Sequence, residues 1–215
     1  MTFKTVATLE LFRKAIDGFI DTKVTGIIID VRGNAGGYDQ MTADFLASFY
    51  ASRVLYEYTT WYNAITGKLE PGWLDEKTNQ LLPEKGIYIE PAPRRYDGPV
   101  VALVNNGCVS SGEGVALGIN NLPNGKVVGF YGTNGSFGMS GDKAAMPGGY
   151  VVHWPFGQSL DSNRVVQLDS RYGVGGVLPN KRVPMTLENA LSAAGGHDVE
   201  LDYALQVLSQ MQKGE

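Results

Sequence analysis

Two runs of apolar, β-branched residues constrain the fold most strongly. Residues 24–31 and 99–104 are nearly continuous hydrophobic segments rich in Val and Ile. Such runs are typical of strands that are buried on both faces, as in a parallel sheet with helices on each side. Each run is followed by a short turn and then by a segment of helical periodicity, at 39–51 and 111–122. The pattern predicts an α/β fold in which both turns lie at the carboxyl ends of neighbouring strands.

The remaining patterns fit the same class of fold. Hydrophobic residues make up 43% and charged residues 19% of the 215 residues, which is the composition of a globular chain. No break in composition suggests a linker, so we expect one domain over residues 1–215. Residues 53–98 are rich in aromatics and turn residues and predict an inserted β-rich excursion. Further elements are predicted as helices at 8–20 and 187–212 and strands at 126–129, 149–155 and 164–168.

Several classes of function are disfavoured by composition. Lys and Arg number 18 against 22 Asp and Glu, without a basic tract, which argues against a nucleic-acid surface. Cys108 is the single cysteine, so no internal disulfide is expected, and no cluster of His, Cys and Asp suggests a metal or another cofactor. No apolar run approaches the roughly 18 residues of a membrane span. The N-terminus lacks the pattern of a signal peptide, and we expect the chain to be a piece of a longer protein.

The turn at residues 104–113 is the most informative candidate site. A buried strand ends there, and a helix begins at Ser110 and Ser111. A serine at this place is commonly an N-cap, and Glu113, three residues after Ser110, completes the pattern of a capping box. In the functional interpretation, the positive end of the helix stabilises a developing alkoxide on the serine. The turn is not the G-x-S-x-G elbow of the α/β-hydrolases.

The glycine turn at residues 32–37 is the second candidate site. It is either a flexible connection or a cradle of backbone N–H groups that a ligand can approach closely, because glycine lacks Cβ. The segment has neither the Lys-Ser/Thr pair of a P-loop nor the G-x-G-x-x-G of a dinucleotide site. A nucleotide site is therefore not expected.

Four segments in order resemble the carboxyl-terminal processing (tail-specific) serine proteases. They are IIIDVRGNAGG, PVVALVNNGCVSSGEGVALGI, KVVGFYGTNG and YGVGGVLPNKRVPMT, and together they extend over about residues 24–190. The chain looks most similar to the branch that contains the tricorn core and the retinoid-binding-protein-like repeats. The resemblance implies a crotonase-like (ClpP-like) ββα core. Family members carry a PDZ-like module upstream, so the chain is expected to be a catalytic-core fragment without that module.

The resemblance assigns roles to residues in both turns. The nucleophile of the family falls on Ser110. The oxyanion hole falls on the backbone N–H of Ser111 and on one from the Gly36–Gly37 pair. Backbone donors of this kind typically contribute about 3–4 kcal/mol each to stabilising the tetrahedral intermediate.

The general base is harder to place, because the branches of the family use different bases. In the Ser-Lys members, a lysine within a Phe-Gly-Lys-Gly segment follows the third strand. The corresponding segment here has Met139, which cannot accept a proton, and Lys143 is displaced by several positions. The tricorn-like branch uses a histidine upstream of the first core strand, steered by a serine and a glutamate. This comparison implies that the base lies upstream of Met1.

Two residues within the chain, His153 and Asp169, could instead complete a catalytic triad with Ser110. His153 lies in a predicted strand and is a candidate base, although a structural role is the alternative. Asp169 matches the position of the acidic partner shortly before the Gly-Val-x-Pro segment, where an ordinary turn aspartate is the alternative. His197 lies in a Gly-Gly-His loop and is expected at the surface.

The leading functional hypothesis is a serine endopeptidase core that hydrolyses polypeptides through an acyl-enzyme on Ser110, without metal or cofactor. The alternative is a non-catalytic module that binds an apolar ligand or peptide, with the aromatics at 56–62 lining its cleft. A crotonase-type thioester enzyme is a third candidate, which the serine at the helix start argues against. The sequence leaves the oligomeric state open. The family implies a periplasmic or extracellular location.

Overall fold

The computed structural model describes residues 4–73, 75, 77–78, 80, 82, 85–170 and 175–214. Its centre is a four-stranded sheet in which all neighbouring strands are parallel. The strands, in spatial order, are β1 (Ile27–Asp30), β5 (Val100–Leu103), β6 (Gly125–Gly129) and β9 (Lys181–Arg182). The two apolar runs of the sequence are thus adjacent strands, and the prediction of an α/β fold is confirmed.

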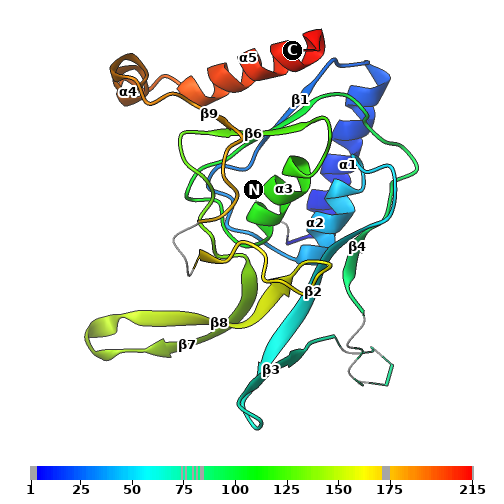
Figure 1. Ribbon diagram of the computed structural model, residues 1–215, viewed down its shortest axis with the longest axis vertical. Coiled ribbons are helices and arrows are strands. Elements are labelled where there is room, and N and C mark those ends of the chain that lie inside the picture. Colours follow the sequence, from blue (N-terminus) through cyan, green and yellow to red (C-terminus); the bar gives the residue numbers. More distant parts are fainter. Residues whose placement is uncertain are drawn as a thin grey trace.

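Helices cover both faces of this sheet (Figure 1). Helices α1 (Val6–Asp21), α2 (Asp39–Leu46) and α3 (Ser111–Asn120) lie on one face, and α5 (Val199–Lys213) lies on the other. Alternate residues of β5 point to opposite sides: Val100 and Ala102 join the cluster under the three helices, whereas Val101 joins the cluster under α5. Because both faces are covered, each strand needs apolar residues at successive positions, which explains its unbroken hydrophobic run.

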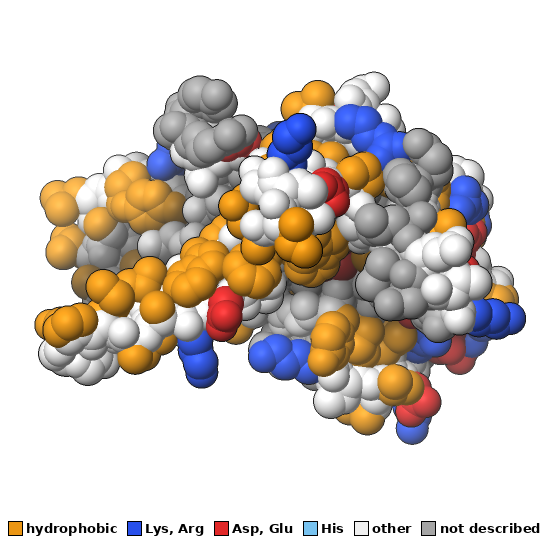
Figure 2. Space-filling model, turned by 90° about the horizontal axis from the view of Figure 1, so that it is seen from below, with side chains coloured by type: hydrophobic (Ala, Val, Ile, Leu, Met, Phe, Trp, Pro, Cys, Tyr) orange, Lys and Arg blue, Asp and Glu red, His pale blue; other side chains and the backbone are white. Residues whose placement is uncertain are grey.

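A second sheet is antiparallel and projects away from the helices (Figure 1). Its strands are β3 (Lys68–Pro71), β2 (Val54–Asn63), β8 (Val151–Leu160) and β7 (Gly138–Ala145) in spatial order, and β4 (Ile87–Ile89) also pairs with β2. A 3-10 turn, η1 (Pro147–Gly149), joins β7 to β8. Figure 2 shows hydrophobic side chains gathered along the projecting β7–β8 hairpin, where Val152, Trp154 and Phe156 are exposed.

Some elements differ from the sequence-based expectations. Strand β7 was not predicted, since its sequence, GMSGDKAA, has low strand propensity. The predicted strand at 164–168 is wrong: Arg164 and Leu168 have positive φ angles of 64° and 50°, and only a single bridge at Val166 remains. The final region at 187–212 contains helices, as predicted: α4 (Leu187–Ala194) and α5, separated at Gly195 and Gly196. Among the described residues, no helix has both the length and the apolar character needed to cross a membrane.

Candidate active site

The two turns predicted to carry the site lie side by side at the carboxyl ends of β1 and β5. The amide of Val109 donates to the carbonyl of Asn34 at 2.9 Å. The amide of Gly33 donates to the side-chain oxygen of Asn105 at 3.0 Å. These bonds fasten the bases of the turns together, so residues 36–37 and 110–111 face each other.

Ser110 has an unusual backbone conformation at the junction between this turn and α3. Its φ of 53° and ψ of −132° are rare for a residue with a Cβ. Such conformations cost roughly 1–3 kcal/mol and persist where the surrounding structure enforces them, often at functional sites. The Ser110 side chain makes no capping hydrogen bond, so the interpretation as an ordinary N-cap is wrong.

Glu113 does not complete a capping box either. Its buried carboxylate accepts hydrogen bonds from the Thr133 hydroxyl at 2.6 Å and from the amides of Gly135 and Ser136 at 2.6 and 2.7 Å. Gly176 leaves the space that this carboxylate occupies, because a Cβ there would collide with Thr133 and Glu113. Glu113 therefore fixes the loop at 133–136, which forms one wall of the site.

Ser111 differs from Ser110 in both exposure and bonding. Its side chain is fully buried, and its hydroxyl lies 3.0 Å from the carbonyl oxygen of Gly37 and 2.7 Å from Oδ1 of Asp39. A hydroxyl held in this way is not available to attack a substrate. Its backbone N–H belongs to the first turn of α3, where amides have no partner within the helix and can bind an anion.

Gly36 packs directly against the two serines. A Cβ on Gly36 would lie 2.7 Å from the Ser110 Cβ and 3.2 Å from the Ser111 nitrogen, and its φ is +81°. The Gly36 amide itself donates to the side-chain oxygen of Asn34 at 2.8 Å. Of the two predicted glycines, Gly36 thus provides space beside Ser110, while its own amide is already bonded to Asn34.

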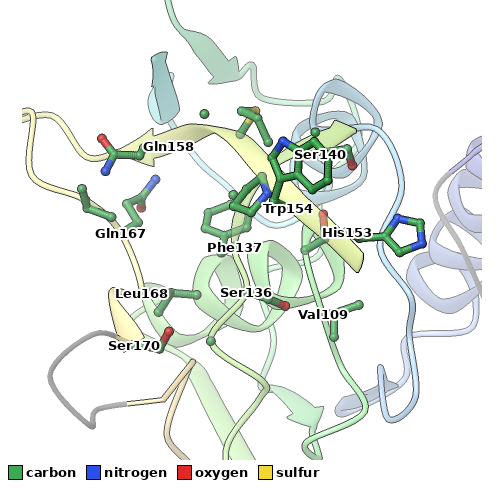
Figure 3. A pocket seen from close by; sticks show the side chains of 18 of the residues that line it. Val109, Ser136, Phe137, Ser140, His153, Trp154, Gln158, Gln167, Leu168 and Ser170 are labelled. Carbon is green, nitrogen blue, oxygen red and sulfur yellow. The ribbon is translucent and has the colours of Figure 1, made fainter. Parts of the chain in front are cut away.

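A cavity of about 600 Å³ opens beside Ser110 and Gly37 (Figure 3). Strand β8 supplies His153 and Trp154 on one side, and Leu168 and Ser170 lie on the opposite side of the view. Its apolar lining consists of Ala35, Val109, Phe137, Met139, Trp154, Pro155, Val166 and Leu168. The cavity therefore offers an apolar chamber next to a serine hydroxyl.

The two predicted triad partners of Ser110, His153 and Asp169, lie on the wall of this cavity. Both line it together with Ser110, whose side chain makes no capping hydrogen bond. The ring of His153 is turned outward from the other labelled side chains (Figure 3). Residues 171–174, which follow Asp169 in the matched segment, lie outside the described residues.

The structure also places the remaining residues that were considered as bases or surface residues. Met139 is buried in β7, and Lys143 is exposed and pairs in register with His153. His197 is exposed and pairs with Asp202 at 2.6 Å, as expected for a surface residue. Lys4 also lines the cavity, and no sequence pattern points to it, because its approach depends on the path of the chain into α1.

Two acidic residues behind the site were not anticipated. Glu57 is fully buried in β2, and neither of its carboxyl oxygens has a hydrogen-bond partner among the described residues. Burial, together with the nearby charge of Asp39, raises the pKa of Glu57 to about 9. Burial likewise raises the pKa of Asp39. Glu57 is therefore protonated at neutral pH.

Within the described ranges, no group of three or more His, Cys, Asp or Glu side chains could hold a metal ion. Cys108 is buried, and burial raises the pKa of its thiol to about 12. It is therefore a thiol at neutral pH and a poor nucleophile.

Comparisons with known proteins agree with the geometry. The model of "Peptidase family S41" matches residues 2–165. No curated protein matches the chain. A solved structure of a peptidase candidate from Parabacteroides merdae ATCC 43184 is 24% identical with a TM-score of 0.64, and the match covers 92% of this chain and 56% of that one.

Two further solved structures have the same fold. The photosystem II D1 C-terminal processing protease is 18% identical with a TM-score of 0.57, covering 87% of this chain and 43% of that one. The tricorn protease is 21% identical with a TM-score of 0.51, covering 87% of this chain and 15% of that one. Identities this low show the fold alone, and the chain spans about half or less of the length of these three proteins.

The parallel sheet, its flanking helices and the antiparallel excursion define the class of crotonase-like (ClpP-like) α/β domains. Within that class, the chain belongs to peptidase family S41, the family of the C-terminal processing serine proteases.

Proposed function

We propose that this domain hydrolyses peptide bonds through an acyl-enzyme on Ser110. The observation that carries the proposal is the conformation of Ser110: its backbone is strained, its side chain makes no capping hydrogen bond, and it lies against Gly36 at the start of α3. This arrangement presents a nucleophile beside the first-turn amides of α3, which have no partner within the helix.

The chemistry follows from the positions of these groups. The Ser110 oxygen attacks the carbonyl carbon of the substrate and loses its proton to a base. The resulting oxyanion is stabilised by the amides of Ser111 and Gly37 and by the positive end of α3. Collapse of the intermediate breaks the C–N bond, and the departing amine takes up a proton. Water then hydrolyses the acyl-enzyme and restores the Ser110 hydroxyl.

For the base, His153 with Asp169 as its acidic partner is the pair within the chain that we propose to test. Support for the pair comes from their shared position on the cavity that contains Ser110. A positioned base contributes about 10²–10⁴ in rate, so an unsuitable base would leave a slow enzyme with an intact nucleophile. Reactivity of Ser110 and turnover of peptide are therefore separate measurements.

Hydrolysis of casein and of a fluorogenic peptide library tests the proposal. We expect Ser110→Ala to abolish turnover. Ser111→Ala should retain measurable turnover, because its amide remains. Loss of turnover in Ser111→Ala with full activity in Ser110→Ala would assign the nucleophile to Ser111. Loss of activity in His153→Ala would support His153 as the base, whereas unchanged activity would exclude it.

The second candidate function is a non-catalytic module that binds an apolar ligand or peptide. A separate cavity of about 580 Å³, lined by Trp61, Tyr62 and Trp73, favours it. The predicted aromatics at 56–62 thus divide: Tyr56 is buried, whereas Trp61 and Tyr62 line a cavity that shares no lining residue with that of Ser110. Binding of an apolar fluorophore that Trp61→Ala abolishes, in a protein without peptide turnover, would support this function.

A further inference from the structure

The hydrogen bonds between the turns at 32–37 and 104–113 lie at different distances from the proposed oxyanion hole. The bonds from Val109 to Asn34 and from Gly33 to Asn105 lie at the bases of the turns. The contact between the Ser111 hydroxyl and the Gly37 carbonyl joins the residues that carry the two proposed oxyanion donors. It is therefore the contact best placed to set the distance between those donors.

The Ser111 hydroxyl is in turn held by Asp39. Asp39 is the first residue of α2, directly after Tyr38, and its Oδ1 lies 2.7 Å from the Ser111 oxygen. The hydroxyl of Tyr56 lies 3.4 Å from the same carboxyl oxygen. The Tyr56 ring packs edge-on against Phe137, which lines the cavity, with ring centroids 5.9 Å apart. Asp39 thus links the start of α2 to the start of α3.

We propose that Asp39 is a positioning residue, which acts through the Ser111 hydroxyl to hold the amides of Ser111 and Gly37 in register for the oxyanion. This inference rests on the proposed function. In this proposal, Asp39 does not contact the substrate.

The hydrogen-bond donors and acceptors around Asp39 support its role as a positioning residue. Ser111 has one hydroxyl hydrogen, and its oxygen lies within hydrogen-bond distance of two acceptors, the Gly37 carbonyl at 3.0 Å and Asp39 Oδ1 at 2.7 Å. Glu57 retains its proton at neutral pH because burial and Asp39 raise its pKa. The hydroxyls of Ser111 and Tyr56 both lie within hydrogen-bond distance of Asp39 Oδ1, at 2.7 and 3.4 Å. The Ser111 side chain is held from two sides, which restricts the rotation of the residue that bears the amide.

The expected effect of losing this link is large but incomplete. Oxyanion donors act at 2.7–3.1 Å from the developing charge, and losing one donor lowers the rate about 10²–10³-fold. Releasing the link leaves both amides present but less well placed. We therefore expect a decrease of about 10–100-fold in the rate of covalent modification, with little change in reversible binding.

The test measures the inactivation rate constant and the reversible binding constant for a fluorophosphonate, whose phosphoryl oxygen occupies the oxyanion position after Ser110 attacks and fluoride leaves. The variants are Asp39→Ala, Asp39→Asn, Ser111→Ala and the double variant of Asp39→Ala with Ser111→Ala. Asp44→Ala is the matched control, because Asp44 lies on the same helix and bonds to the Gln40 side chain. Thermal melting of each variant confirms the fold.

We expect Asp39→Ala and Ser111→Ala to slow inactivation to a similar extent, and the double variant to be no slower than either. Asp39→Asn, which keeps an acceptor oxygen, should recover most of the rate, and Asp44→Ala should match the original protein. Additive losses in the double variant would overturn the inference, since Asp39 would then act independently of Ser111.

The outcomes separate this inference from the proposed function. If the original protein is not modified at Ser110, the proposed function fails and the inference fails with it. If the original protein is modified but Asp39→Ala and Ser111→Ala react at the same rate as it does, only the inference fails. Should Asp39→Ala not fold, Ser111→Ala still decides, because an unchanged rate in that variant would overturn the inference.

Discussion

Glu57 should make the stability of this domain depend on pH in a way that a single substitution removes. The side chain is fully buried behind the site, without a hydrogen-bond partner among the described residues. Glu57→Gln keeps its shape and removes its titration. We expect this variant to gain stability relative to the original protein as the pH rises.

The direction and the size of this pH dependence of the free energy of unfolding follow from proton linkage. The pKa of Glu57 is about 9 in the folded protein, against an ordinary value of 4.5. Between these values the folded state keeps a proton that the unfolded state releases, so unfolding becomes easier as the pH rises. One pH unit corresponds to about 1.4 kcal/mol, so the original protein loses at most about 3 kcal/mol of stability between pH 4.5 and 7 from this group. Below pH 4.5 both states are protonated and the contribution is fully present.

Urea denaturation at one-unit steps from pH 5 to pH 9 measures the effect. The free energy of unfolding of Glu57→Gln, minus that of the original protein, should increase with pH throughout this range. Glu10→Gln, on the exposed side of α1, controls for the general loss of a carboxylate. If the curves of Glu57→Gln and the original protein run parallel between pH 5 and 9, the account of Glu57 as a buried neutral acid is refuted.

Two further predictions concern the walls of the site. Gly36→Ala should abolish modification of Ser110, because its new Cβ would press on Ser110; Gly33→Ala has a similar φ of +65° but open space, and should label normally. Equal labelling of the two variants would contradict the close packing at Gly36. Glu113→Gln should lower the free energy of unfolding by about 1–3 kcal/mol, since it places an amide against the donors of the 133–136 loop. An unchanged urea midpoint for this variant would show that the loop does not depend on the carboxylate.

The parallel sheet could be predicted because its strands are buried on both faces and therefore have a distinct composition. The same reasoning placed the turns after β1 and β5 together, which the bond between Val109 and Asn34 confirms. Strand β7 could not be found in this way. It contacts β8 along an exposed hairpin, so pairing rather than its own residues determines its conformation.

The site itself was only partly predictable, because its bonds join distant positions. Local spacing suggested that Ser110 and Glu113 form a capping box, but the Glu113 carboxylate binds residues 20 to 23 positions away. Asp39 and Ser111 are 72 positions apart and share no local pattern. Ser110 and Gly36 are likewise distant in sequence but packed together, which spacing does not reveal.

The central claim is that Ser110 is the nucleophile of this S41 peptidase domain. The most direct test is to treat the protein with a fluorophosphonate and to locate the adduct by tandem mass spectrometry of its peptides. We expect a single adduct on Ser110, which is absent from Ser110→Ala and present in Ser111→Ala. An adduct on Ser111, or no adduct on a folded protein, would contradict it.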